Sequence, residues 1–153
     1  MSTLDNTLRV TNSMRDKYFL DTNVFVYSFD ERAAAKRRRA LTLIRQALAS
    51  GRGVVSYQVV QEFVNVALRR FARPMSASEA EQYLALVFRP LLAIHSSPEL
   101  YEAALRLTGS GGLSWYDSLI VAAAQQGQCQ TLYSEDLQHG RKFDELEVLN
   151  PFA

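Results

Sequence analysis

Four acidic residues stand where the chain passes from one predicted element to the next. Asp21 directly follows the short apolar run 18–20, and Asp136 comes just after another predicted strand, 131–133. Glu62 lies in the first turns of a predicted helix, and Asp117 opens a strongly apolar one. Carboxylate oxygens are the ligands that Mg²⁺ and Mn²⁺ prefer in proteins. Because four carboxylates in one cleft repel each other unless a cation is bound, this set suggests a metal site.

Such a site suits the hydrolysis of a phosphodiester bond. A bound metal orients and activates water and stabilises charge on the leaving oxygen. Asn23 and Ser134 are placed to hold a carboxylate or a metal-bound water. We therefore predict catalytic roles for six residues, of which the four acids also bind metal: Asp21, Glu62, Asp117, Asp136, Asn23 and Ser134.

Each acid also has a simpler interpretation. Asp21 could cap a helix, Asp136 could be a turn residue, and Glu62 could be a solvated acid on a helix face. Ser114 stands three residues before Asp117, which resembles a capping box with Asp in place of Glu. The signals are weak singly, and it is their order along the chain that favours one shared site.

The elements that must position these residues alternate between strands and helices. Alternation of this kind implies right-handed crossovers and a mainly parallel sheet with helices on both faces. In such sheets ligands bind beyond the carboxyl ends of the strands, where Asp21, Glu62 and Asp136 are expected. The glycine cluster 109–112 is predicted to be a loop. We predict strands at 18–20, 53–56, 94–96, 131–133 and 146–149, and helices at 32–50, 58–71, from 76 or 78 to 92, 98–107 and 115–126.

Size and composition indicate one globular domain. The chain has 153 residues, and we assign 1–13 to a flexible polar tail and 14–153 to the domain, with Met14 as an alternative start. No apolar run is long enough to span a membrane, and the N-terminus lacks a secretory pattern. The single Cys129 cannot form an intramolecular disulfide. These features predict a cytoplasmic protein that does not bind membranes.

Charge and aromatic residues are compatible with a polyanionic substrate. The chain has 17 Lys and Arg against 16 Asp and Glu, so setting four acids aside leaves 17 − 12 = +5. The densest basic run, 36–39, either contacts phosphates or forms a solvated helix face. Tyr57, Trp115 and Tyr116 lie near the acids and could stack on unpaired bases, although core packing explains Trp115 equally well.

Four segments resemble the motifs of PIN domains, and the resemblance runs from about Lys17 to Asn150. It is nearest to the VapC-like toxins of bacterial type II toxin–antitoxin systems. The motif positions match the acidic quartet and its two polar helpers. The segments are Phe19-Leu20-Asp21-Thr22-Asn23-Val24, Ser56 to Glu62, Leu113 to Ile120, and Tyr133-Ser134-Glu135-Asp136-Leu137.

The resemblance implies a single-domain PIN-like α/β fold with a central, mainly parallel five-stranded sheet flanked by helices. It also implies an endoribonuclease that cleaves single-stranded RNA with Mg²⁺ or Mn²⁺. The implied partners are a second copy in a homodimer and a cognate antitoxin whose tail covers the active site.

Other classes fit less well. A haloacid-dehalogenase-like phosphatase needs a second acid two residues after the first, where this chain has Asn23. A receiver-type domain needs paired acids at the first strand and a late-strand lysine, and neither is found. The remaining alternative is a PIN-fold RNA-binding or RNA-processing module without a toxin role.

Overall fold

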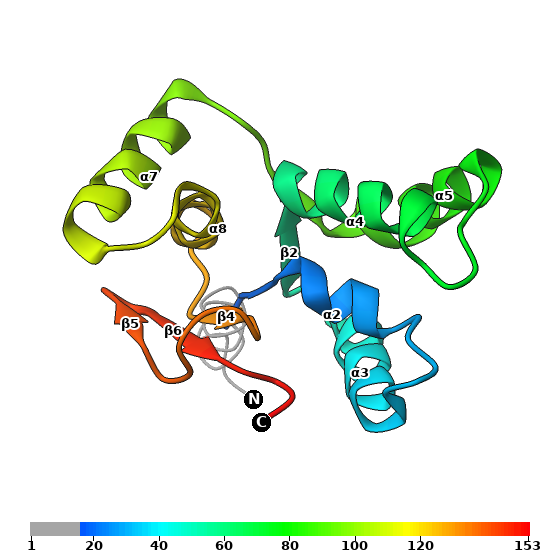
Figure 1. The fold of residues 1–153 in the computed structure, drawn as a ribbon. Helices are drawn as coiled ribbons and strands as arrows, with labels where there is room; N and C mark the ends of the chain where they lie inside the picture. Colours follow the sequence, from blue (N-terminus) through cyan, green and yellow to red (C-terminus); the bar gives the residue numbers. More distant parts are fainter. Residues whose placement is uncertain (1–15) are drawn as a thin grey trace, which may run out of the picture.

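A six-stranded sheet lies at the centre of the structure, a computed structural model that describes residues 16–153 (Figure 1). Neighbouring strands are parallel throughout, except that β5 runs antiparallel to β6. The tail predicted for 1–13 and the alternative start at Met14 lie outside the described residues. The order across the sheet is β3 (Leu92–Ile94), β2 (Gly53–Ser56), β1 (Tyr18–Leu20), β4 (Thr131–Tyr133), β6 (Leu146–Leu149) and β5 (Lys142–Phe143).

The prediction of a mainly parallel sheet is confirmed. Five strands were predicted, whereas the sheet has six. The missed strand β5 forms a hairpin with β6, in which Lys142 pairs with Glu147. Two residues connect the strands, and Asp144 takes a φ of 55° there. Two-residue hairpin turns favour Asn-Gly or Asp-Gly because they need positive φ. Asp144-Glu145 lacks the glycine, so no clear hairpin signal is present at this turn.

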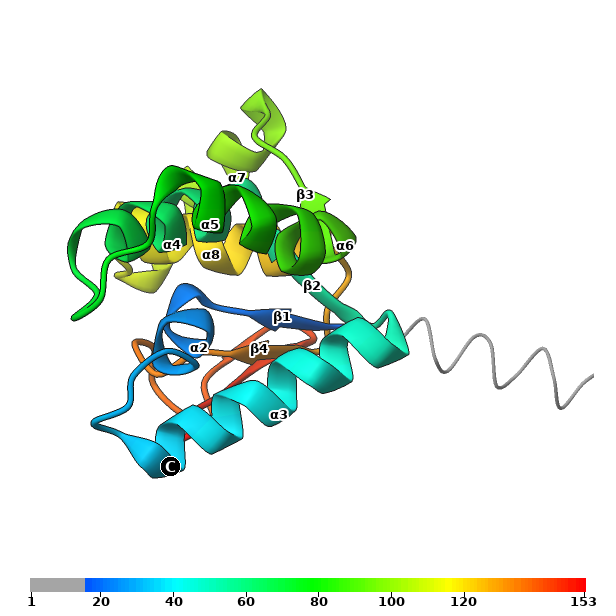
Figure 2. The ribbon, with the colours of Figure 1, turned by 90° about the vertical axis from the view of Figure 1, so that its right-hand side faces the viewer.

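Helices cover both faces of the sheet, as predicted. Figure 2 shows α4, α5 and α8 above the sheet and the long α3 beneath it. The described helices are α2 (Thr22–Tyr27), α3 (Ala34–Ser50), α4 (Tyr57–Arg69), α5 (Ala77–Tyr83), the π-helical η1 (Leu84–Phe88), α6 (Arg89–Leu91), α7 (Pro98–Gly111) and α8 (Trp115–Gln126). None of them, over residues 16–153, is long and apolar enough to cross a membrane.

The predicted glycine loop was wrong, because α7 continues through the cluster to Gly111. Gly112 ends the helix with a φ of 66°, a conformation that glycine adopts without strain. The last turns of α7 are held from outside: Thr108 donates to Ser118 Oγ at 2.8 Å, and Arg141 donates to the Gly111 carbonyl at 2.7 Å. These contacts outweigh the low helix propensity of glycine.

The core explains why the central strands lack polar alternation. Phe19 and Leu20 in β1 and Val55 in β2 are completely buried, as expected for strands covered on both faces. Helix α8 is buried along most of its length, from Ser118 to Ala124. At Gly53 the backbone of β2 approaches α3 so closely that a Cβ atom there would lie 2.3 Å from Ala47 Cβ. The result is a closely packed sheet, and the predicted acids Asp21, Glu62 and Asp136 follow the carboxyl ends of its strands.

Candidate active site

Strand register places Asp21 beside Ser134. In the parallel pair β1 and β4, Leu20 is aligned with Tyr133, so the next residue of each strand emerges at the same edge. The Asp21 carboxylate accepts hydrogen bonds from Ser134 Oγ at 2.7 Å and from the Thr22 backbone N–H at 2.7 Å. The second bond makes Asp21 the N-cap of α2, so the capping interpretation also holds. Asp21 therefore caps α2 and is also a candidate site residue.

The Asp21 carboxyl group is buried, with only 5% of the residue exposed. Burial raises its pKa to about 7, although the hydrogen bonds from Ser134 and Thr22 oppose the shift. The negative charges of Asp136 and Glu62 raise the pKa further. The protein therefore holds a carboxylate where negative charge is unfavourable at neutral pH, and a cation would relieve this.

Glu62 is held by two hydrogen bonds that the sequence analysis did not predict. Thr22 Oγ1 donates to one carboxylate oxygen at 2.5 Å, and Gln58 Nε2 donates to the other at 2.8 Å. Thr22 therefore connects Asp21 to Glu62. The same Gln58 amide also donates to the Tyr116 carbonyl at 3.2 Å, which ties α4 to the start of α8. The i, i+4 spacing of Gln58 and Glu62 is compatible with this pair, but the same spacing is typical of a solvated helix face.

Asp136 follows β4 and joins the same edge through Ser134. Its backbone N–H donates to Ser134 Oγ at 3.2 Å, the hydroxyl that also binds Asp21. Although the residue as a whole is exposed, partial burial of its carboxyl raises its pKa, and the charges of Asp117 and Glu135 add to this. Asp117 thus lies within electrostatic reach of Asp136.

Asp117 is in the first turn of α8, where its backbone N–H donates to Ser114 Oγ at 3.2 Å. The half of the capping box made by Ser114 is therefore present. The Asp117 side chain is half-buried and accepts no hydrogen bond from another described residue. Its placement in the site rests on its charge effect on Asp136 and on the link from Tyr116 to Gln58.

Asn23 lies at the same edge, in the first turn of α2. Both polar atoms of its amide are buried without a hydrogen-bond partner among residues 16–153. The amide is close enough to Asp136 to lower the pKa of that carboxyl, yet the geometry falls short of a hydrogen bond. The other buried side-chain atoms that lack a partner in this part of the chain are Ser56 Oγ and Gln58 Oε1. They lie at the end of β2 or within the first residues after β1 and β2.

The donor atoms of these residues suit a hard divalent cation better than the spacing of their side chains does. Their donors are carboxylate, amide and hydroxyl oxygens, the set that Mg²⁺ and Mn²⁺ take. The raised pKa of Asp21 and the unpartnered Asn23 amide are both features that a bound ion would satisfy. Nowhere in the described chain do three or more His, Cys, Asp or Glu side chains converge closely enough to hold a metal ion. The acids are thus grouped by charge and by shared hydroxyl donors.

The aromatic residues near the acids divide into two kinds. Tyr116, next to Asp117, is 67% exposed. Trp115 is half-buried and packs on Tyr101, with ring centroids 6.1 Å apart. Burial and a hydrogen bond with Tyr101 raise the pKa of Tyr57 to about 12, so its hydroxyl stays protonated. Tyr116 is therefore the most exposed of these three aromatic side chains, while Tyr57 and Trp115 are half-buried.

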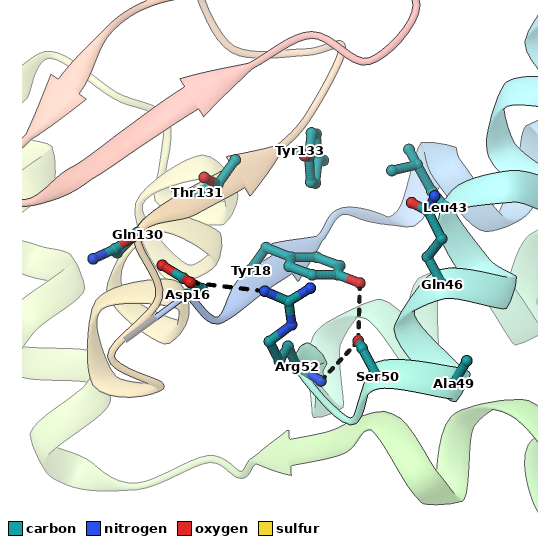
Figure 3. Close-up of a pocket in the computed structure, with 10 residues that line it drawn as sticks. All are labelled: Asp16, Tyr18, Leu43, Gln46, Ala49, Ser50, Arg52, Gln130, Thr131 and Tyr133. Carbon is teal, nitrogen blue, oxygen red and sulfur yellow. Dashed lines mark hydrogen bonds and ion pairs between the residues drawn. The ribbon is translucent and has the colours of Figure 1, made fainter. Parts of the chain in front are cut away.

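A separate pocket of about 610 Å³ opens between α3 and the strands β1 and β4 (Figure 3). On its floor Arg52 forms an ion pair with Asp16 at 3.8 Å, and the Tyr18 hydroxyl lies 3.4 Å from Ser50 Oγ. None of the predicted acids lines it. The pocket is thus distinct from the acidic edge.

Fold and site together define an α/β protein with acidic side chains at the carboxyl edge of a parallel sheet. The family model of the PIN domain matches residues 18–145. The chain belongs to the PIN-domain family. A search of curated protein sequences found no match.

Solved structures share this fold at low sequence identity. A toxin–antitoxin complex from Klebsiella pneumoniae has a TM-score of 0.63 and 20% identity, covering 88% of this chain and 98% of that one. The Mycobacterium tuberculosis toxin VapC20, described as cleaving the sarcin–ricin loop, has a TM-score of 0.55 and 19% identity over 77% and 88%. FitAB bound to a DNA fragment has a TM-score of 0.63 and 16% identity over 89% and 96%.

Proposed function

We propose that this protein is a divalent-metal-dependent endoribonuclease and the toxin of a toxin–antitoxin pair. The observation that carries the proposal is the buried Asp21 carboxylate, which shares its surroundings with Glu62 and Asp136. Structural neighbours described as a toxin–antitoxin complex and as an RNA-cleaving toxin support the choice of role.

In this proposal Asp21, Glu62, Asp117 and Asp136 hold Mg²⁺ or Mn²⁺. The bound ion supplies a Lewis acid for the phosphodiester and lowers the pKa of water. Ser134 and Thr22 orient Asp21 by donating to its two carboxylate oxygens, and Thr22 Oγ1 together with Gln58 orients Glu62. Fixed carboxylates of this kind keep their geometry without reorganisation during the reaction.

Asn23 and Tyr116 are the residues that we assign to substrate. The Asn23 amide has a free donor and acceptor beside Asp136, suited to a phosphate oxygen or a water. Tyr116 presents an exposed ring next to Asp117, suited to stacking on an unpaired base. A base can stack in this way only when it is not paired in a duplex, which favours a single-stranded substrate.

Cleavage of labelled single-stranded RNA tests the proposal. We expect cutting in Mn²⁺ or Mg²⁺, none in EDTA, and a loss of at least about 100-fold in Asp21→Asn and Asp117→Asn. Circular dichroism and unfolding curves verify that both variants fold. Parallel reactions on single-stranded DNA and on duplex RNA define the substrate class. Full activity in both variants would disprove the assignment.

Two partners belong to the proposal, a second copy of this chain and an antitoxin. Two exposed apolar side chains on η1, Leu84 at 39% and Leu86 at 73%, support a protein contact surface. Sedimentation of the isolated protein and co-expression with the product of a neighbouring gene measure each partner. RNA binding without cleavage would instead favour an RNA-binding module.

A further inference from the structure

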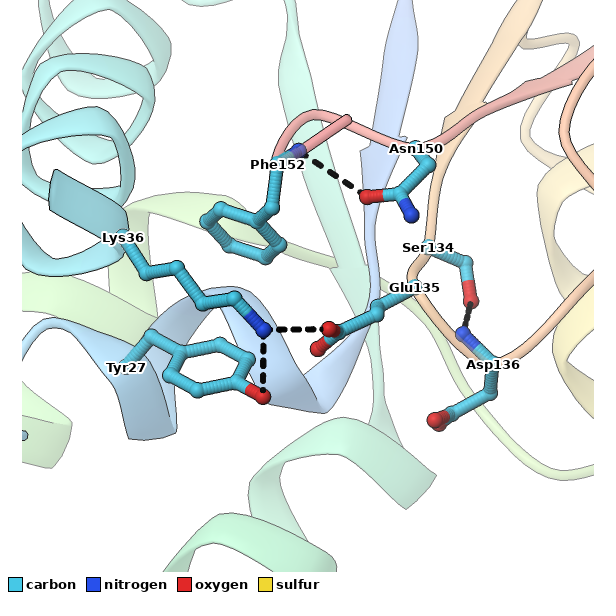
Figure 4. A network of polar contacts seen from close by, with 7 residues as sticks. All are labelled: Tyr27, Lys36, Ser134, Glu135, Asp136, Asn150 and Phe152. Carbon is cyan, nitrogen blue, oxygen red and sulfur yellow. Dashed lines mark hydrogen bonds and ion pairs between the residues drawn. The ribbon is translucent and has the colours of Figure 1, made fainter. Parts of the chain in front are cut away.

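Glu135 is a fifth acid at this edge, and its carboxylate is bound on the side of α3. It stands between Ser134, whose hydroxyl binds Asp21, and Asp136, whose backbone N–H binds that hydroxyl. Figure 4 shows that Glu135 and Asp136 leave the loop in different directions, with Glu135 turned toward α3. There the Lys36 ammonium donates to the Glu135 carboxylate at 2.6 Å.

Lys36 is itself held by aromatic neighbours. Its ammonium donates to the Tyr27 hydroxyl at 3.2 Å and lies 4.5 Å from the Tyr27 ring centroid. The Phe152 ring centroid is 5.8 Å from the same ammonium, and the rings of Tyr27 and Phe152 are 4.9 Å apart (Figure 4). The side chains of Lys36 and Glu135 are only 37% and 27% exposed. Lys36 is therefore fixed by α2, the C-terminal turn and Glu135, unlike a solvated residue of a basic helix face.

The Ser134–Asp136 segment is thus fastened at two points. Ser134 ties it to β1 through Asp21, and Glu135 ties it to α3 through Lys36. If Lys36 acted through its charge alone, it would weaken metal binding, because a cation next to the acids repels the metal ion. A pair that fixes the loop has the opposite effect, since it keeps Asp136 beside Asp21.

We infer that Lys36 is a positioning residue for the acidic site: through Glu135 it fixes the loop that carries Asp136. The expected consequence of the inference, a change in metal affinity, rests on the proposed function. The loop geometry itself can be tested without metal. All the residues involved lie outside the acidic quartet: Lys36 is on α3, Tyr27 on α2, Glu135 in the loop after β4 and Phe152 in the C-terminal turn.

The first experiment uses backbone ¹⁵N relaxation of the full chain in EDTA. In the parent protein we expect the Asp136 amide to have an order parameter near the rigid value of about 0.85, falling toward about 0.6 in Lys36→Met. Arg38→Met is the matched control, because it removes the same charge from an exposed position of the same helix. The Leu132 amide in β4 should be unchanged in both variants. An equally rigid Asp136 in Lys36→Met would overturn the inference.

Glu135→Ala provides a second route to the same break. It should loosen the Asp136 amide as much as Lys36→Met does, and the double variant should loosen it no further, because both changes remove one contact. Additive effects of the two changes would contradict the inference.

The second experiment measures Mn²⁺ affinity by electron paramagnetic resonance of the free ion. If Lys36 positions the loop, Lys36→Met binds Mn²⁺ about 10-fold more weakly than the parent, and Lys36→Arg restores binding. If Lys36 acts by charge alone, Lys36→Met binds more tightly, which overturns the inference. Failure of the parent to bind Mn²⁺ would refute the proposed function, while the relaxation data still decide the role of Lys36.

Discussion

Replacing Asp21 by Asn should stabilise the metal-free protein at neutral pH while abolishing its activity. Asp21 is buried and its pKa is raised from 3.8 to about 7. Between these two values the folded protein keeps a proton that the unfolded chain has released. The free energy of unfolding therefore falls as the pH rises from about 4 to 7 and levels off above. Asn cannot ionise, so the variant escapes this loss.

The size of the effect follows from the shift. A shift of about three pKa units corresponds to an upper limit of about 4 kcal/mol at high pH, of which about 2–3 kcal/mol develops between pH 5 and pH 8. Asn is close in shape to the protonated acid and still accepts from Ser134 or Thr22. We therefore expect Asp21→Asn and the parent to have similar free energies of unfolding near pH 4. Between pH 5 and pH 8, the stability advantage of the variant over the parent should grow by about 2–3 kcal/mol.

Urea unfolding in EDTA at pH 5 and pH 8 measures this difference. Glu31→Gln, a change at an exposed acid between α2 and α3, serves as the control and should not alter the pH dependence. Adding Mn²⁺ at 100 times its dissociation constant should restore about 2.7 kcal/mol to the parent and little to the variant. A gap between variant and parent that stays constant or shrinks as the pH rises would refute the reasoning.

Three further predictions concern neighbouring residues. Thr22→Val removes the hydroxyl that donates to Glu62. It should lower the rate of RNA cleavage about 10-fold and change the free energy of unfolding by no more than about 1 kcal/mol. An unchanged cleavage rate would show that Thr22 is not part of the site. Gly53→Ala places a Cβ against Ala47. It should lower the free energy of unfolding in urea by about 1–3 kcal/mol, with RNA cleavage intact at urea concentrations below the unfolding transition. An unchanged free energy of unfolding would show that α3 can shift. Tyr116→Ala should raise KM for single-stranded RNA several-fold with little change in kcat, whereas Tyr116→Phe should leave KM unchanged. Equal KM values in the parent and both variants would exclude stacking.

The sequence predicted the acidic edge because two rules are local. An apolar run that ends in an acid identifies a strand end, and parallel strands bring their ends to one edge. Asp21 and Ser134 are neighbours for this reason, in register across β1 and β4. Apolar periodicity predicted the helices α3, α4 and α8 and the buried strands β1 and β2, whereas the short helix α2 was not predicted.

Contacts between distant segments decided the rest. Thr22 donates to Glu62 across 40 residues, and Lys36 donates to Glu135 across 99, so no local pattern predicts either bond. The hairpin at Asp144 and the continuation of α7 through Gly111 also depend on tertiary contacts that override weak local propensity. Residue types and their order along the chain determined which groups occupy the carboxyl edge. Only the folded structure determined which donors orient those groups, because hydrogen-bond partners are set by proximity in space.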